Sequence, residues 1–244
     1  MFDAEISGVR FNDVIEVIKP HVLFPKYQGT AVVWTPEMHL DADYIAMFLE
    51  LCGRTCYKSE GRITTASAKK FLEGLIRSGH ESVIEHYSFT VKFVGDRAMS
   101  HQLVRHRLGA YSQESQRYCD YGKANKLNVI LPDTIEQSDE QVKNSWAKSV
   151  LMSYLAYREL RDKGVRPEDA RSVLPNSTKT EIVATYNLRQ WRHVFRERAC
   201  SKRVQGQIRE LTTMILEECK RCLPFIFFDF EIKNGEAIYR PEIR

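Results

Sequence analysis

Residues 102–118 read QLVRHRLGAYSQESQRY, and no other stretch of the chain says more about its fold and use. Positive charge comes from three adjacent residues and one later arginine: Arg105, His106, Arg107 and Arg117. Neutral hydrogen-bonding groups are supplied by Ser112, Gln113, Ser115 and Tyr118. Such a stretch offers many donors and little apolar surface, so it suits an anion-rich ligand such as a nucleotide better than a core.

The first half of this stretch predicts a helix over residues 97–107. Because each helical residue turns by about 100°, Arg105 and Arg107 would lie about 200° apart and point away from each other. They would then hold two ligands, or one ligand and one subunit contact. The step Leu108–Gly109–Ala110 is expected to end the helix in a loop, which presents residues 112–117.

The sequence around this stretch alternates between helical and strand periodicity. Apolar spacing and caps predict helices over residues 41–52, 65–77, 139–163, 187–198 and 204–222, with a short helix from Pro167. In the first of these, the apolar stripe is Tyr44, Met47, Phe48 and Leu51. Strands are expected at residues 14–18, 31–34, 87–93 and 181–186, with a terminal apolar segment at 225–232. This order predicts a helix-dominated α+β fold with a mixed or antiparallel sheet, as a single domain over residues 1–244.

Composition narrows the class of protein. The chain is 43% hydrophobic and 28% charged, with a net charge of +4, as in soluble globular proteins. No apolar run approaches the roughly 20 residues that span a membrane, and residues 1–10 do not resemble a secretory signal. We therefore expect a cytoplasmic protein with no membrane partner. Acidic residues are interspersed almost everywhere outside the central stretch and residues 189–203, which disfavours a nucleic-acid partner.

The six cysteines do not form a convincing metal site. Cys52 with Cys56 and Cys219 with Cys222 could be two halves of a zinc site, but both pairs lie in apolar, helix-like surroundings without nearby histidines. We expect no metal and buried, reduced thiols. Cys119 follows the central stretch but has no evident base partner, so we expect a structural rather than a nucleophilic role.

Five blocks together resemble the flavin-dependent thymidylate synthase family. The central one is Arg105–His106–Arg107, then seven residues, then Ser115, followed by Arg117–Tyr118. The others, in the family's order, are GHESVIEH at 79–86, ARSVLP at 170–175, NLR at 187–189 followed by Arg198, and QGQIR at 205–209. The resemblance covers about residues 40–230 and leaves 1–36 unassigned.

The His80 block has a structural alternative. A second histidine at the HExxH spacing would fall at Ile84, so His80–Glu81 is not a zincin motif. A histidine ahead of a strand is more often structural than catalytic. The resemblance nevertheless implies that His80 belongs to the active site, near flavin and folate.

The resemblance implies reductive methylation of dUMP to dTMP, with FAD as cofactor and 5,10-methylenetetrahydrofolate and NADPH as co-substrates, in a homotetramer whose active sites are shared between subunits. The implied catalytic residues are Arg198, which favours the ionised uracil, and His80. The implied dUMP-binding residues are Gln102, Arg105, Gln113, Ser115, Arg117, Arg171 and Arg198. The implied FAD-binding residues are Ser82, Arg105, His106, Arg107, Gln113, Asn187, Arg189 and His193.

Four positions depart from the family's frequent residues. Ala110, Ser112 and Gln113 replace Ser, Asn and Glu, and His193 replaces Asn. Gln113 keeps hydrogen-bonding groups but lacks a carboxylate. Two other readings stay open: a nucleotide- or nucleic-acid-binding module that uses the basic run, and a flavoprotein that has lost thymidylate chemistry.

Overall fold

The computed structural model describes residues 2–56, 58–124 and 126–243. These residues form two compact units, each made of three stretches of chain. Unit 1 contains residues 1–21, 94–103 and 112–182, and unit 2 contains residues 22–93, 104–111 and 183–244. The single domain expected over 1–244 stays a prediction.

The largest sheet has five strands in the order β5-β4-β6-β9-β7. Their bounds are Ala31–Thr35 for β5, His21–Gln28 for β4, Ser88–Asp96 for β6, Lys179–Asn187 for β9 and Ala110–Gln113 for β7. Strands β4 and β5 pair antiparallel as a hairpin. Three two-stranded sheets complete the described strands, two of them antiparallel and one, β3 with β8, parallel. The predicted α+β class with a mixed or antiparallel sheet is confirmed.

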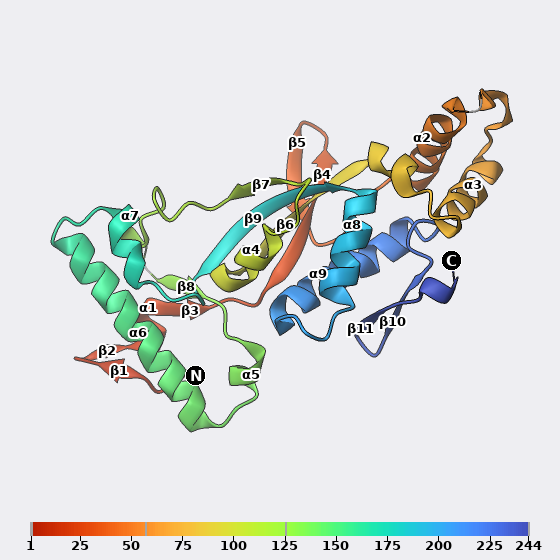
Figure 1. Cartoon of the computed structure of the whole chain (residues 1–244). Coiled ribbons are helices and arrows are strands. Elements are labelled where there is room, and N and C mark those ends of the chain that lie inside the picture. The colour runs from red at the N-terminus through yellow and green to blue at the C-terminus, as the bar shows by residue number, and fades with distance from the viewer. Residues whose placement is uncertain (1, 57, 125, 244) are drawn as a thin grey trace. The chain divides into compact units, whose positions relative to one another are not determined.

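Unit 1 is built around one long helix, α6 (Glu140–Asp162), with the N-terminal β1–β2 ribbon and α1 beside it (Figure 1). Its other elements are β1 (Glu5–Ile6), β2 (Val9–Arg10), α1 (Phe11–Val14), β3 (Ile15–Val17), α4 (Arg97–Leu103), η3 (Tyr121–Lys123), β8 (Leu127–Val129), α5 (Asp133–Glu136), α7 (Pro167–Ala170) and η4 (Arg171–Val173). Buried side chains of α6, including Tyr154 and Tyr157, pack with Phe11 and Val129 in one core. Residues 2–17, which the resemblance leaves unassigned, therefore have a structural role in this core.

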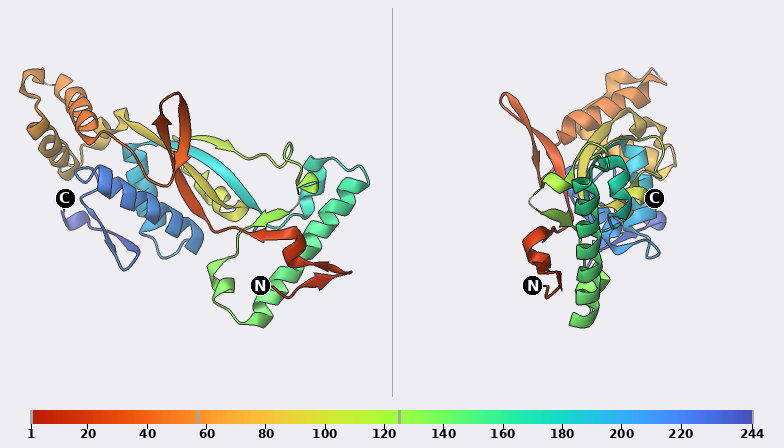
Figure 2. Two further views of the ribbon diagram at one scale, coloured as in Figure 1. Left: turned by 180° about the vertical axis from the view of Figure 1, so that it is seen from behind. Right: turned by 90° about the vertical axis from the view of Figure 1, so that its left-hand side faces the viewer.

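Unit 2 combines an α2–α3 helical hairpin with the C-terminal helices, and the hairpin is visible in Figure 1 and in both views of Figure 2. Its elements besides strands are α2 (Ala42–Thr55), η1 (Glu60–Arg62), α3 (Thr65–Arg77), η2 (Glu81–His86), α8 (Leu188–Val194), the π-helical turn η5 (Phe195–Ala199), α9 (Gly206–Cys222) and η6 (Pro241–Ile243). Strands β10 (Phe230–Lys233) and β11 (Glu236–Tyr239) lie between α9 and η6. Its aromatic core centres on Trp191, which stacks on Phe89 and Phe195.

Helix caps lie where the sequence predicts them. The Asp41 carboxylate accepts from the backbone N–H of Tyr44 at 2.9 Å, and the Asn187 side chain accepts from Gln190 N–H at 2.8 Å. Gly79 follows α3 with a φ of 77°, a left-handed conformation that glycine adopts without steric cost. Side-chain capping bonds therefore set the starts of α2 and α8, and a glycine sets the end of α3.

The helix expected over residues 97–107 ends earlier, at Leu103. Arg105 and Arg107 lie in the turn that follows, so the argument that a helix points them to opposite faces was wrong. In this turn the His106 carbonyl accepts from the Tyr111 hydroxyl. The loop expected after Leu108 was also partly wrong, because residues 110–113 form strand β7.

The apolar stripe predicted for α2 lies on the wrong face. Tyr44 and Leu51 are exposed, whereas Ile45, Ala46, Leu49 and Gly53 are buried. The buried face is selected by close packing: a Cβ on Gly53 would stand only 2.8 Å from Cε1 of Phe71. The periodicity identified a helix but misassigned its packed side.

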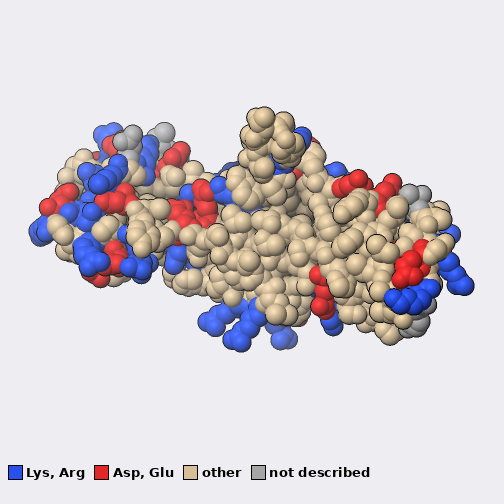
Figure 3. Space-filling view, turned by 90° about the horizontal axis from the view of Figure 1, so that it is seen from above, with Lys and Arg blue, Asp and Glu red and all other residues tan. Residues whose placement is uncertain are grey.

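Charged side chains of both signs lie close together on the face shown in Figure 3, without a continuous basic stripe among the described residues there. Among residues 2–56, 58–124 and 126–243, no helix combines the length and the apolar character needed to cross a bilayer.

Candidate active site

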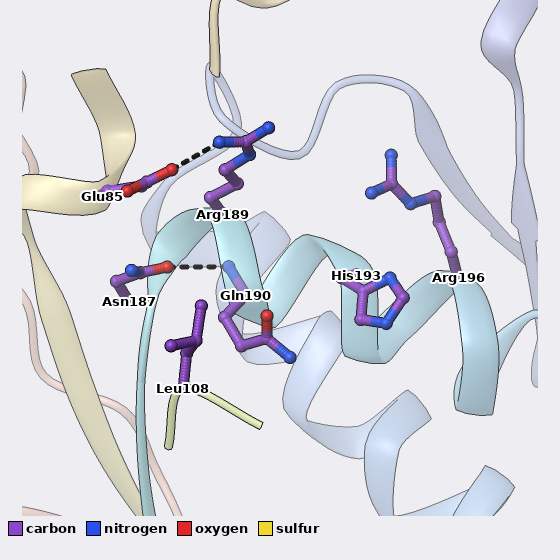
Figure 4. A pocket seen from close by; sticks show the side chains of 7 residues that line it. All are labelled: Glu85, Leu108, Asn187, Arg189, Gln190, His193 and Arg196. Carbon is purple, nitrogen blue, oxygen red and sulfur yellow. Dashed lines mark hydrogen bonds and ion pairs between the residues drawn. The ribbon is translucent and has the colours of Figure 1, made fainter. Parts of the chain in front are cut away.

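A cavity of about 350 Å³ opens in unit 2 beside helix α8 (Figure 4). Its lining residues are Glu85, Leu108, Asn187, Arg189, Gln190, His193 and Arg196. Three of them, Asn187, Arg189 and His193, are among the residues that the resemblance assigns to the flavin. The donors that line the cavity are amides, an imidazole and two guanidiniums, a set that matches phosphate oxygens.

Helix periodicity explains why α8 presents these side chains together. Leu188, Trp191 and Val194 are buried on one side of the helix. Arg189 and His193, four residues apart on α8, therefore share the open side, and Arg196 follows them from the adjoining turn η5. The sequence analysis missed Arg196, Gln190, Glu85 and Leu108, although the spacing from Arg189 and His193 was a readable signal for Arg196.

Arg189 is held across the cavity by an ion pair. Its Nη1 lies 2.5 Å from Oε1 of Glu85, and the two side chains are 52% and 43% exposed (Figure 4). A solvent-screened pair of this kind stabilises a protein by at most about 1 kcal/mol. An anionic ligand could therefore replace Glu85 as the partner of Arg189 at little cost.

The motif histidine His106 contacts Arg198, which lies 92 residues away in the sequence. Nε of Arg198 donates to Nε2 of His106 at 2.8 Å, and the imidazole is 5% exposed. Burial, with smaller contributions from the nearby charges of Arg198 and His193, lowers the pKa of His106 to about 4. His106 is therefore neutral near pH 7, with its proton on Nδ1 and its Nε2 lone pair directed at Arg198.

Arg198 lies on a π-helical turn, which changes the side on which it emerges. The N–H of Cys200 bonds the carbonyl of Phe195, five residues earlier, at 2.9 Å. Arg198 comes seven residues after Trp191, which is about two turns of a regular α-helix. If the helix were regular, Arg198 would therefore lie on the same buried face as Trp191. The π turn inserts one residue and rotates Arg198 away from that core, a local distortion that recurs at functional sites.

A buried ion cluster ties α8 to η2. Arg192 is fully buried and binds both oxygens of Asp229, at 2.8 and 2.6 Å, and approaches Oε1 of Glu81 at 3.4 Å. Glu81 lies between His80 and Ser82, two exposed residues assigned by the resemblance. Breaking a buried pair by removing one partner typically costs about 3–5 kcal/mol, so Arg192 fixes the position of this segment firmly.

A second group of predicted residues comes together in unit 1. Glu168 accepts from Nε of Arg117 at 3.0 Å through its carboxylate and from Nε of Arg171 at 3.1 Å through its backbone carbonyl. The Ser115 hydroxyl accepts from the backbone N–H of Arg117 at 3.3 Å. The structure thus assembles three residues of the implied dUMP set around Glu168, which the sequence analysis did not single out.

Gln113 is held within unit 1 as well. Its side-chain amide donates to the hydroxyls of Ser100, at 2.9 Å, and Thr180, at 3.2 Å. Gln113 is one of the positions that depart from the family, where a glutamate is frequent. Both bonds use its Nε2 group.

The remaining predicted site residues do not form a cluster of this kind. Arg105 and Arg107 are exposed in the turn after α4, and Gln102 is half-buried within α4. Among the described residues, the lining of the unit 2 cavity does not include His80 or Ser82. Most of the implied flavin set belongs to unit 2, while most of the implied dUMP set belongs to unit 1.

The expectation of buried thiols was only partly correct. Cys219 is buried, but Cys56 and Cys119 are exposed. The structural rather than nucleophilic role expected for Cys119 rests on its lack of a base partner and stays a prediction. Within the described parts of the chain, no three His, Cys, Asp or Glu side chains are grouped closely enough to hold a metal ion.

Comparison with known proteins places the chain in a family. The family model described as thymidylate synthase complementing protein matches residues 44–225. A flavin-dependent thymidylate synthase of Geobacter sulfurreducens is 38% identical over 73% of this chain and 79% of its own length. One from Pyrococcus furiosus is 37% identical over 71% of each chain.

A solved structure shares the fold. The UMP/dUMP methylase PolB of Streptomyces cacaoi, crystallised with 5-Br dUMP, superposes with a TM-score of 0.67 at 21% identity, covering 88% of this chain and 95% of its own. The extent of the family match and the identity to these relatives lead to one conclusion: the chain belongs to the thymidylate synthase complementing protein family, that of the flavin-dependent thymidylate synthases.

Proposed function

We propose that the chain converts dUMP to dTMP by reductive methylation, with FAD bound in unit 2. The observation that carries this proposal is the contact between Arg198 and His106 at 2.8 Å, which joins two of the five blocks on which the resemblance rests. Methylenetetrahydrofolate supplies the one-carbon unit and NADPH the reducing equivalents. Bound FAD supplies the redox chemistry, so the protein's task is to position rings and place charge.

The donors of the unit 2 cavity fit an anionic cofactor. Arg189 and Arg196 offer fork-shaped guanidiniums, and Asn187 and His193 add neutral hydrogen-bonding groups. These four residues would hold the diphosphate part of FAD. His193, which replaces the asparagine frequent in the family, keeps a ring N–H for the same purpose.

The Ser115, Arg117 and Arg171 group fits the phosphate of dUMP. Arg117 and Arg171 are both oriented by Glu168, so their guanidiniums are held in place before a ligand binds. Gln102, Arg105 and Gln113 complete the proposed dUMP set.

Arg198 is the proposed catalytic cation. A guanidinium beside the uracil imide favours its ionised form and polarises the ring for attack, and charge placed in this way contributes several kcal/mol to a transition state. A neutral His106 accepts a hydrogen bond from Arg198 without cancelling its charge, so the positive field stays available to the substrate. His80 is the second proposed catalytic residue, placed next to Glu81 and the buried Arg192 cluster.

The proposal extends to assembly and location: a cytoplasmic homotetramer with active sites shared between subunits. The division of the implied ligand sets between two groups of residues is compatible with such sharing, and no nucleic-acid partner is expected.

One purification tests the proposal. The protein is expected to be yellow or to take up added FAD, to be bleached by NADPH faster when dUMP is present, and to release dTMP when methylenetetrahydrofolate is added. A colourless protein that binds no FAD would refute the proposal. Bleaching without dTMP formation would support the alternative, a flavoprotein without thymidylate chemistry.

A further inference from the structure

The turn that carries the Arg105–His106–Arg107 motif has a costly conformation. Leu108 has a φ of 65° and is 86% exposed, although a bulky residue rarely adopts the left-handed region. Such a conformation is energetically unfavourable for a leucine and persists only where the surroundings impose it. Leu108 itself is mostly in solvent, so what imposes this conformation must lie in the residues beside it.

Two tyrosines on the neighbouring strands β7 and β9 are linked to this turn through hydrogen bonds. The Tyr111 hydroxyl on β7 donates to the backbone carbonyl of His106. The hydroxyl of Tyr186 on β9 lies 2.6 Å from that of Tyr111. Because the single hydroxyl proton of Tyr111 is used on His106, Tyr186 must donate to the Tyr111 oxygen. The three groups therefore form one directed chain of hydrogen bonds that ends on the motif.

Gly109 lets the Tyr186 ring reach the turn. A Cβ at position 109 would stand 2.2 Å from Cε1 and 2.6 Å from Cδ1 of Tyr186. The ring therefore lies against the backbone of the turn, where any side chain would displace it. Gly109 is required here for space.

The tyrosine pair is itself anchored in the core. Tyr186 is 1% exposed and meets the ring of Trp191 edge-on at 4.8 Å. Trp191 stacks on Phe89 at 4.7 Å. Displacement of the turn would therefore require rearrangement of the aromatic core around Trp191.

The consequence reaches the proposed catalytic arginine. The tyrosines fix the backbone of His106, and the His106 ring accepts from Nε of Arg198 at 2.8 Å. We propose that Tyr111 and Tyr186 are positioning residues that hold the Arg105–His106–Arg107 turn in its ligand-binding conformation and, through His106, orient Arg198. This inference deepens the proposed function and rests on it.

The test uses three hydroxyl deletions in the full-length protein: Tyr111→Phe, Tyr186→Phe and, as matched control, Tyr27→Phe. Tyr27 is 73% exposed on β4 and belongs to neither ligand set. The first readout is the ¹⁵N and ¹H resonances of the His106 imidazole in the ligand-free protein, assigned by comparison with His106→Gln. The second readout is the dissociation constant for FAD.

Tyr111→Phe removes both hydroxyl bonds, so we expect it to shift the His106 resonances and to raise the dissociation constant for FAD about tenfold. Tyr186→Phe leaves the bond from Tyr111 to His106 in place, so its effects should be in the same direction and smaller. Tyr27→Phe should match the unmodified protein. Because Tyr186→Phe deletes only one bond, it serves as the decisive variant if Tyr111→Phe does not fold.

Unchanged His106 resonances in Tyr111→Phe would overturn the inference. Shifted resonances with an unchanged dissociation constant would also overturn it, because the turn would then not position the flavin site. Failure of the proposed function looks different: the unmodified protein would bind no FAD or form no dTMP, whatever the histidine spectra show.

Discussion

Acidification should destabilise the ligand-free protein through His106. The pKa of His106 is lowered from 6.5 to about 4 in the folded chain, first by burial and then by Arg198 and His193. The unfolded chain therefore binds a proton at this residue more readily than the folded chain. Stability contributed by neutral His106 is fully present above about pH 6.5 and is lost progressively as the pH falls toward 4.

The size of this effect follows from the two pKa values. At about pH 5, a group with pKa values of about 4 folded and 6.5 unfolded lowers the free energy of unfolding by about 2 kcal/mol relative to about pH 8. The loss saturates at about 3 kcal/mol below pH 4. Because His106 is 5% exposed, solvent screening reduces this figure little.

The assay compares urea unfolding of the unmodified protein and His106→Gln at about pH 8 and about pH 5. Glutamine can still accept the hydrogen bond from Arg198 but does not titrate. Ionisable groups far from position 106 contribute equally to both proteins and cancel in the difference. The unmodified protein should lose about 2 kcal/mol more than the variant between the two pH values.

Equal losses in the two proteins would refute the reasoning, because burial beside Arg198 would then not disfavour the imidazolium. A midpoint near 6.5 in an NMR titration of the His106 ring would contradict it independently. A midpoint near 4 would support it.

Three further predictions concern a glycine in close contact with a ring, a buried arginine and the proposed catalytic arginine. Gly109→Ala should lower the free energy of unfolding by about 1–3 kcal/mol and weaken FAD binding, because the new Cβ would overlap the buried Tyr186 ring; thermal melts and flavin titration measure both. Arg192→Met should lower stability by about 3–5 kcal/mol in urea unfolding, since it leaves the Asp229 carboxylate buried without its bidentate partner. Arg198→Ala should abolish dTMP formation while FAD stays bound; unchanged turnover would remove it from the mechanism.

Matched controls separate local from general effects. Gly74→Ala places a Cβ in open space on α3, so it should be neutral or stabilising where Gly109→Ala is destabilising. Arg166→Met alters an exposed arginine in unit 1 and should leave unfolding almost unchanged. Destabilisation by Gly74→Ala or Arg166→Met comparable to that of its partner variant would contradict the steric or ionic argument.

Elements with strong local signals were predictable from the sequence. Asp41 and Asn187 cap helices by accepting, through their side chains, from the backbone N–H three residues later. Alternation of apolar and polar residues along 87–93 predicted strand β6. The packing of the turn after α4 was not predictable, because the Tyr186 ring that lies against Gly109 comes from a strand more than 70 residues away in the sequence. The same holds for the bond between Glu168 and Arg117, which are 51 residues apart.

The sequence by itself determined the family, because motif spacing and donor types are properties of the chain; the residues that it assigns to the ligands stay a prediction. Tertiary structure decided how these residues are presented. The folded chain ends α4 at Leu103, pairs His106 with Arg198 and places Arg198 on a π turn. The pairing of His106 with Arg198 joins residues 92 positions apart, and no local pattern can specify such a contact because local propensity acts only between near neighbours.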